Sequence, residues 1–113
     1  MSILYGVALL SAASAGMVDA EATRLSYSNC LTDFTVTHLD QKTARAQFKK
    51  AAETACPEER SAMTAAIKKD EMEFGSSDAE ATAYANEEVT SVLSSFTEGY
   101  AGYLSSNTRP VKP

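Results

Sequence analysis

The scarcity of large apolar side chains is the feature that most limits how this sequence can fold. Residues 21–113 contain 5 Leu, 1 Ile, 4 Val and 4 Phe, about 15% of that segment. This share lies below the level of roughly 20% at which chains begin to resemble disordered proteins. A chain of 113 residues forms one small domain at most. We therefore expect a covalent cross-link, a dimer interface or a partner protein to supplement its core.

An uncharged apolar run occupies residues 3–16 (ILYGVALLSAASAG). It is followed by Val18, Asp19 and Ala20, which place small or short side chains where a signal peptidase reads them. The run is too short to cross about 30 Å of hydrocarbon. We interpret residues 1–20 as a signal peptide cleaved after Ala20, which leaves no membrane span and directs the protein to the periplasm or outside the cell. The alternative is an N-terminal core helix.

Cys30 and Cys56 are the only cysteines in the sequence. Two cysteines in a short exported chain are expected to form one disulfide. Closing a loop of about 25 residues stabilises a fold by roughly 3 to 4 kcal/mol. The sequence has no CxxC motif and no Cys/His spacing typical of metal sites, so we expect no metal and no cofactor.

The apolar periodicity is helical throughout, and no sustained alternation of strand type occurs. We predict an all-α fold: a small four-helix up-down bundle stapled by one disulfide and preceded by a signal-peptide helix. The helical domain is expected over residues 21–106, followed by a short disordered tail over residues 107–113. The predicted helices span residues 21–39, 44–55, 57–74 and 78–105.

The first predicted helix is apolar on two sides. One face carries Tyr27, Cys30, Leu31, Phe34 and His38. Leu25, Val36 and Leu39 fall on nearly the opposite face, so we expect this helix to lie between two layers or against a partner. Cys30 and Cys56 are equidistant from Thr43 along the chain, which predicts that the disulfide fixes the register of an antiparallel hairpin formed by the first two helices.

Local signals mark the other helix ends. Pro57 is suited to a first helical position, Gly75 to a helix stop, and Ser77 with Glu80 forms a capping box. The third helix is predicted to bury Met63, Ala66, Ile67 and Phe74. The fourth helix carries the stripe Val89, Val92, Leu93, Phe96, Tyr100, Tyr103 and Leu104. We expect Tyr100 and Tyr103 to pack on this stripe with their hydroxyls near the surface, and Tyr84 to lie on the far side as a candidate surface contact.

The sequence offers little that could carry catalysis. His38 is the single histidine, and no GxSxG nucleophile motif is present. We interpret His38 as a partly covered residue at a helix end, with pH sensing as the alternative. Asp70 lies within an apolar stripe, and we expect it where that stripe bends to the surface; a buried carboxyl acting as an acid is the alternative. We therefore expect no enzymatic activity and no catalytic residues.

The charge balance excludes a further class. The net charge is -5 and the sequence pI is about 4.8, whereas binding to nucleic acid or to an anionic membrane requires a basic surface. We therefore expect no nucleic-acid partner.

The segment Tyr27–Leu31, the Ala-rich second helix ending in Ala55 and Cys56, and the pair Glu59–Arg60 resemble small exported bacterial proteins of unknown function with a bridged helical hairpin. The resemblance covers residues 25–70 and implies a disulfide-closed helical fold outside the cytoplasm. The chain is also similar in architecture to periplasmic acid-stress chaperones, which are small, helical and carry one disulfide.

We hypothesise an exported helical protein that acts by protein–protein contact, as an inhibitor, immunity factor or accessory factor does. Its partner is an unidentified protein or a second copy, and the candidate contact residues are Leu25, Val36, Leu39 and Tyr84. The alternative is a pH-responsive periplasmic holdase chaperone, whose trigger would be carboxylate protonation in acid.

Overall fold

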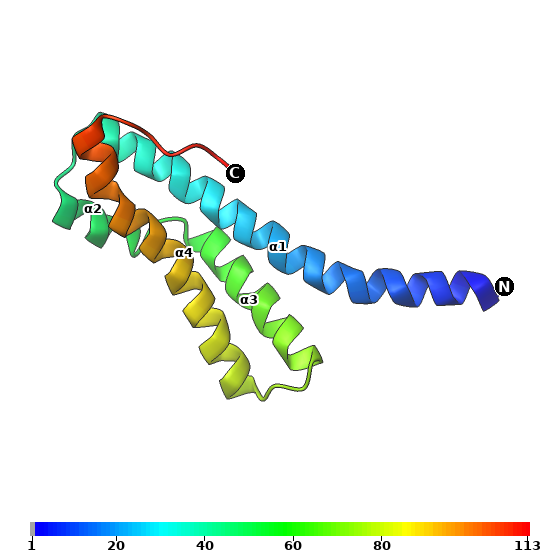
Figure 1. Cartoon of the computed structure of the whole chain (residues 1–113). Helices are drawn as coiled ribbons and strands as arrows, with labels where there is room; N and C mark the ends of the chain where they lie inside the picture. The colour runs from blue at the N-terminus through cyan, green and yellow to red at the C-terminus, as the bar shows by residue number, and fades with distance from the viewer. Residues whose placement is uncertain (1) are drawn as a thin grey trace.

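The computed structural model describes the backbone of residues 2–113 and the side chains of residues 19–113. This part of the chain forms four helices and no strand (Figure 1): α1 (Ser2–Asp40), α2 (Arg45–Ala52), α3 (Pro57–Glu73) and α4 (Asp78–Ser106). The prediction of an all-α fold is therefore confirmed. The signal-peptide interpretation rests mainly on residues 1–18, whose side chains lie outside the part of the chain that the structure describes.

The buried face of α1 contains two threonines besides its large apolar residues. Tyr27, Leu31 and Thr35 are fully buried, and Thr32 is 3% exposed. Each threonine hydroxyl donates to a carbonyl of its own helix, from Thr35 to Leu31 at 2.6 Å and from Thr32 to Ser28 at 2.8 Å. Because these bonds satisfy the hydroxyls, small polar side chains can line the core without an unpaired donor.

The predicted disulfide between Cys30 and Cys56 is confirmed, with 6.2 Å between the Cα atoms. Its position in the fold differs from the expected one. α2 ends at Ala52, and Cys56 is the residue immediately before α3. The bridge therefore joins the C-terminal half of α1 to the start of α3, its main packing neighbour, and does not set the register of a hairpin of α1 with α2.

The local signals around α3 and α4 act as predicted. Pro57 is the first residue of α3, and Gly75 follows that helix with a φ of +102°, a left-handed conformation that glycine adopts readily. The Ser77 hydroxyl accepts the backbone N–H of Glu80 at 3.2 Å and donates to the Glu80 carboxylate at 3.0 Å. Glu80 thus closes the cap through the serine hydroxyl.

The core of the described side chains consists of two clusters. The first lies where α1, α3 and α4 meet and contains Ala20, Tyr27, Leu31, Cys56, Met63, Ile67, Ala85 and Val89. The second joins the ends of α1 and α4 to α2 and contains Leu39, Phe48, Ala52 and Tyr100. The rings of Phe48 and Tyr100 stack with centroids 3.9 Å apart. The short α2 thereby covers the end of the bundle at which α1 ends and α4 ends (Figure 1).

Two apolar residues lie in other places than predicted. Phe74 was expected in the core but is 75% exposed, because α3 ends at Glu73 and the turn into α4 lies away from α1 (Figure 1). Leu39 was expected on an outer face of α1 but is buried in the second cluster. The end of α1 is enclosed by α2 and α4, so Leu39 contacts them although it lies at the edge of the core-facing stripe.

Candidate functional site

The C-terminal segment lies along the outer surface of α1. α4 ends at Ser106, Asn107 turns the chain with a φ of +56°, and residues 108–113 contain no helix or strand. They run back along α1 toward its N-terminal half (Figure 1). The sequence predicts disorder for residues 107–113. In the structure these residues form a non-helical segment that runs along α1, and we call this segment the strap.

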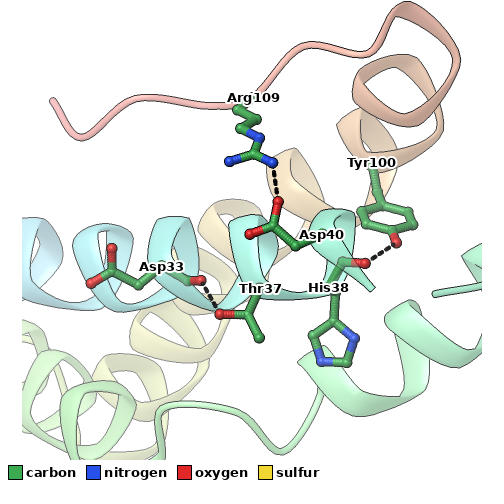
Figure 2. A network of polar contacts seen from close by, with 6 residues as sticks. All are labelled: Asp33, Thr37, His38, Asp40, Tyr100 and Arg109. Carbon is green, nitrogen blue, oxygen red and sulfur yellow. Dashed lines mark hydrogen bonds and ion pairs between the residues drawn. The ribbon is translucent and has the colours of Figure 1, made fainter. Parts of the chain in front are cut away.

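Two ion pairs hold this strap. Arg109 pairs with Asp40, as Figure 2 shows, and Lys112 Nζ lies 3.0 Å from Asp33 Oδ2. About half or more of each of these side chains is exposed to solvent. Exposed pairs of this kind contribute roughly 0.2–1 kcal/mol each and are screened by salt. The strap is therefore held weakly.

The end of the strap reaches one of the predicted contact residues. Pro113 lines a shallow cavity of about 340 Å³ together with Leu25 and Ser28 of α1. Leu25 is 46% exposed. We call the surface formed by Leu25, Asn29, Asp33, Val36 and Asp40 the outer face of α1, because helical spacing places these residues on one side of the helix.

Among the described residues, Asn29 is the one whose side chain has a buried polar atom without a hydrogen-bond partner. Its Oδ1 is buried and accepts no donor. Buried acceptors of this kind are uncommon and costly in folded proteins. Asn29 lies one helical turn from Asp33, on the side toward Leu25. The outer face therefore includes a residue whose side-chain acceptor is shielded from solvent and unpaired.

A second polar site lies where α1, α3 and α4 meet. A cavity of about 160 Å³ is lined by Ala20, Glu21, Arg24, Ile67, Asp70, Glu71 and Tyr84. The Tyr84 hydroxyl donates to Glu88 at 2.8 Å, and this hydrogen bond, with the charge of Glu88, raises the pKa of Tyr84. Arg24 lies 3.7 Å from the same carboxylate. Tyr84 is thus directed to a cleft shared with α1 and α3.

A polar junction closes the end of α1 (Figure 2). The hydroxyl of the fully buried Tyr100 donates to the carbonyl of Thr43 at 2.6 Å and lies 3.2 Å from that of His38. Burial raises the pKa of Tyr100, and the Thr43 side chain acts in the opposite direction to a smaller extent. The expectation that this hydroxyl lies near the surface was wrong, because the loop after α1 folds over it.

His38 and Asp70 occupy ordinary positions. The ring of His38 is partly buried against Phe34 and Phe48, and its Nδ1 lies 2.8 Å from the Thr43 hydroxyl. Asp70 is partly exposed at the rim of the cleft beside Tyr84. Both match the expectations of a half-covered helix-end histidine and of a carboxylate where the apolar stripe meets the surface.

The four candidate contact residues do not form one patch. Leu25 is exposed and Val36 is partly buried on the outer face of α1. Leu39 is a core residue, and Tyr84, although 42% exposed, lies at the three-helix cleft. Two of the four residues, Leu25 and Val36, therefore share the outer face of α1, about 16 Å apart along the helix axis.

Several interacting residues were not singled out from the sequence. Asp33, Asp40, Arg109 and Lys112 hold the strap. The sequence feature that could have indicated them is the charge spacing, with two acids seven residues apart on a helix and two bases three residues apart in a Pro-containing segment.

Arg60, which the sequence singled out only through a resemblance, is a structural residue. It donates to the Tyr27 hydroxyl and to the Ala52 carbonyl, each at 3.3 Å.

No group of three or more His, Cys, Asp or Glu residues among the described side chains is placed to hold a metal ion. Among the described residues, no helix combines the length and apolar character that a membrane crossing requires. No protein family, curated protein or solved structure matches the chain.

Proposed function

We propose that this chain is an exported helical protein, without enzymatic activity, that acts by contact with another protein as an inhibitor, immunity factor or accessory factor does. The observation that carries this proposal is the outer face of α1. Leu25 is 46% exposed there, and the only segment crossing the described part of this face is a strap held by exposed ion pairs. A surface covered so weakly is open to a competing segment.

Export and cleavage after Ala20 complete the proposal. The mature chain would then be an up-down bundle whose first helix begins at Glu21. Ala20 is 8% exposed in the first core cluster, so cleavage would remove this small side chain from the core of the described residues. The disulfide between Cys30 and Cys56 supports an oxidising compartment such as the periplasm or the outside of the cell.

The localisation is tested by the intact mass of the product recovered from the envelope and from the medium, with and without reductant. A mass beginning at Glu21 that rises by about two hydrogens on reduction is the expected result. A chain retained in the cytoplasm with both cysteines reduced would contradict export.

The contact is tested by photo-crosslinking in the native envelope. A photoreactive residue replaces Leu25 on the outer face, and a matched one replaces Glu87, which is exposed on α4. A discrete adduct formed from position 25 and absent from position 87 is expected. If position 25 gives no adduct, or if both positions give the same set, the outer face is not a specific contact surface.

A pH-responsive holdase is the second candidate, and the ion pairs favour it. Each of the four pairs among the described side chains depends on a carboxylate: Arg24–Glu88, Lys68–Asp78, Arg109–Asp40 and Lys112–Asp33. Acid would remove all four and leave the basic charges to repel one another. Circular dichroism and binding of an apolar dye between pH 7 and 2 test this. Unchanged spectra over the whole range would refute the holdase.

A further inference from the structure

The outer face of α1 and the strap match in spacing as well as in charge. Asp33 and Asp40 are seven residues apart on a helix, which separates them by about 10 Å along its axis. Arg109 and Lys112 are three residues apart, and three residues of extended chain also span about 10 Å. The two ion pairs therefore form together only when the segment is extended and antiparallel to α1.

We propose that the outer face of α1 is a binding surface for an extended basic segment of another protein, with two cationic residues three positions apart. The chain's own C-terminal strap occupies this surface and competes with that partner. This inference rests on the proposed contact function and specifies the chemistry of its partner.

Proline content indicates why a foreign segment can displace the strap. Pro110 and Pro113 have no backbone N–H, and Pro113 lies beside Leu25 and Ser28. The neighbouring Asn29 keeps a shielded Oδ1 without a donor. A partner segment without proline at this level can donate an N–H to Asn29. The strap of a second copy would carry the same prolines, so the observations favour a different protein.

The weak hold of the strap fits a competing role. Its backbone donates hydrogen bonds at its start, where Asn107 N and Thr108 N both donate to the Tyr103 carbonyl, Thr108 N at 3.1 Å. Val111 is 85% exposed, so it adds little apolar contact. The surface is therefore available for a fraction of the time, and the apparent affinity of a partner is reduced by that fraction. Weakening the strap should raise the apparent affinity.

The test uses the full chain and a fluorescein-labelled peptide with the strap sequence NTRPVKP in fluorescence polarisation at low salt. The variant R109E/K112E repels the strap from Asp33 and Asp40. The control K49E/K50E makes the same change of charge on the exposed face of α2. A peptide of the same composition with adjacent cations, NTPVRKP, tests the spacing.

We expect R109E/K112E to bind NTRPVKP about tenfold more tightly than the wild type does. K49E/K50E should gain less than about twofold, and adding D33N/D40N to R109E/K112E should abolish the gain. NTPVRKP should bind more weakly than NTRPVKP. Equal gains in both charge variants, equal binding of the two peptides, or no binding to R109E/K112E would each overturn the proposal.

Light scattering on the wild type tests whether a second copy of the chain occupies the outer face of α1. A monomer supports the proposal, whereas a dimer that R109E/K112E dissociates would assign the face to a second copy and overturn it. If the peptide fails to bind while the photo-crosslink at position 25 forms, the contact function stands and the basic-peptide inference falls.

Discussion

Replacing Tyr100 with Phe removes one hydroxyl from the junction that closes the end of α1. The ring is fully buried and stacks on Phe48 at 3.9 Å, so the apolar packing remains. The hydroxyl donates to the Thr43 carbonyl at 2.6 Å, and that carbonyl loses its donor. The loss of such a bond costs about 1–2 kcal/mol of unfolding free energy. In a domain of this size each kcal/mol corresponds to about 4–8 °C in Tm.

Urea denaturation and thermal melting followed by circular dichroism measure the effect. Y103F is the matched control, because Tyr103 lies on the same helix and is partly exposed, and its hydroxyl makes no hydrogen bond to the described residues. Y103F should change the unfolding free energy by less than about 0.5 kcal/mol. If Y100F costs no more than Y103F, the junction does not stabilise the fold through this hydroxyl.

The same residue predicts a pH dependence. Burial raises the pKa of Tyr100, whereas a tyrosine in an unfolded chain ionises near pH 10. Above that pH the unfolded state loses the tyrosine proton before the folded state does. The stability contributed by the protonated Tyr100 hydroxyl is therefore complete below about pH 10 and is lost as the pH rises through the folded-state pKa. The wild type should lose more stability than Y100F between pH 9 and 11. Parallel losses in the two proteins would refute this assignment.

Four further substitutions test packing, backbone conformation and helix ends by urea denaturation. F48A should cost about 3–4 kcal/mol, because Phe48 is fully buried against Tyr100; a loss below about 1 kcal/mol would show that α2 is not packed there. G75A should destabilise by about 1 kcal/mol because of its φ of +102°, whereas G102A, in a helix with open space around it, should stabilise by up to about 1 kcal/mol; equal effects would contradict the assigned conformations. S77A should cost about 1 kcal/mol through loss of the α4 cap, and no cost would mean that water replaces the hydroxyl.

Features set by a few neighbouring residues could be predicted from the sequence. Pro57 and Gly75 fix backbone angles by their own covalent structure, and Ser77 caps α4 through residues three positions away. The helical class follows from periodicity, and the bridge follows from two cysteines in a short chain whose first twenty residues predict export. Each of these inferences needs no knowledge of how distant segments pack.

Features that depend on distant segments could not be predicted. Phe74 fits the apolar stripe of α3, but whether it is covered depends on where α1 lies at the α3–α4 turn. Leu39 is buried because α2 encloses the end of α1. The burial of Thr35 was missed for a different, local reason: its hydroxyl donates to the Leu31 carbonyl of its own helix, which allows a polar residue to be buried. Hydropathy patterns do not include such hydrogen bonds.

The strap was missed for a related reason. Residues 107–113 are polar and Pro-containing, which is typical of disordered ends. Their contact with α1 depends on two weak ion pairs across 69 and 79 positions of sequence. Only the matched spacing of Asp33 with Asp40 and of Arg109 with Lys112 hints at it, and that match has meaning only once the two segments are known to be antiparallel.

The contribution of the Cys30–Cys56 bridge to a core with few large aliphatic side chains is tested most directly by urea denaturation of the oxidised and the reduced protein. The cysteines are 26 positions apart, and closing a loop of that length contributes about 3.5 kcal/mol. Reduction should lower the unfolding free energy by about that amount, and C30S/C56S should match the reduced wild type. Unchanged unfolding free energy after complete reduction would contradict the role assigned to the bridge.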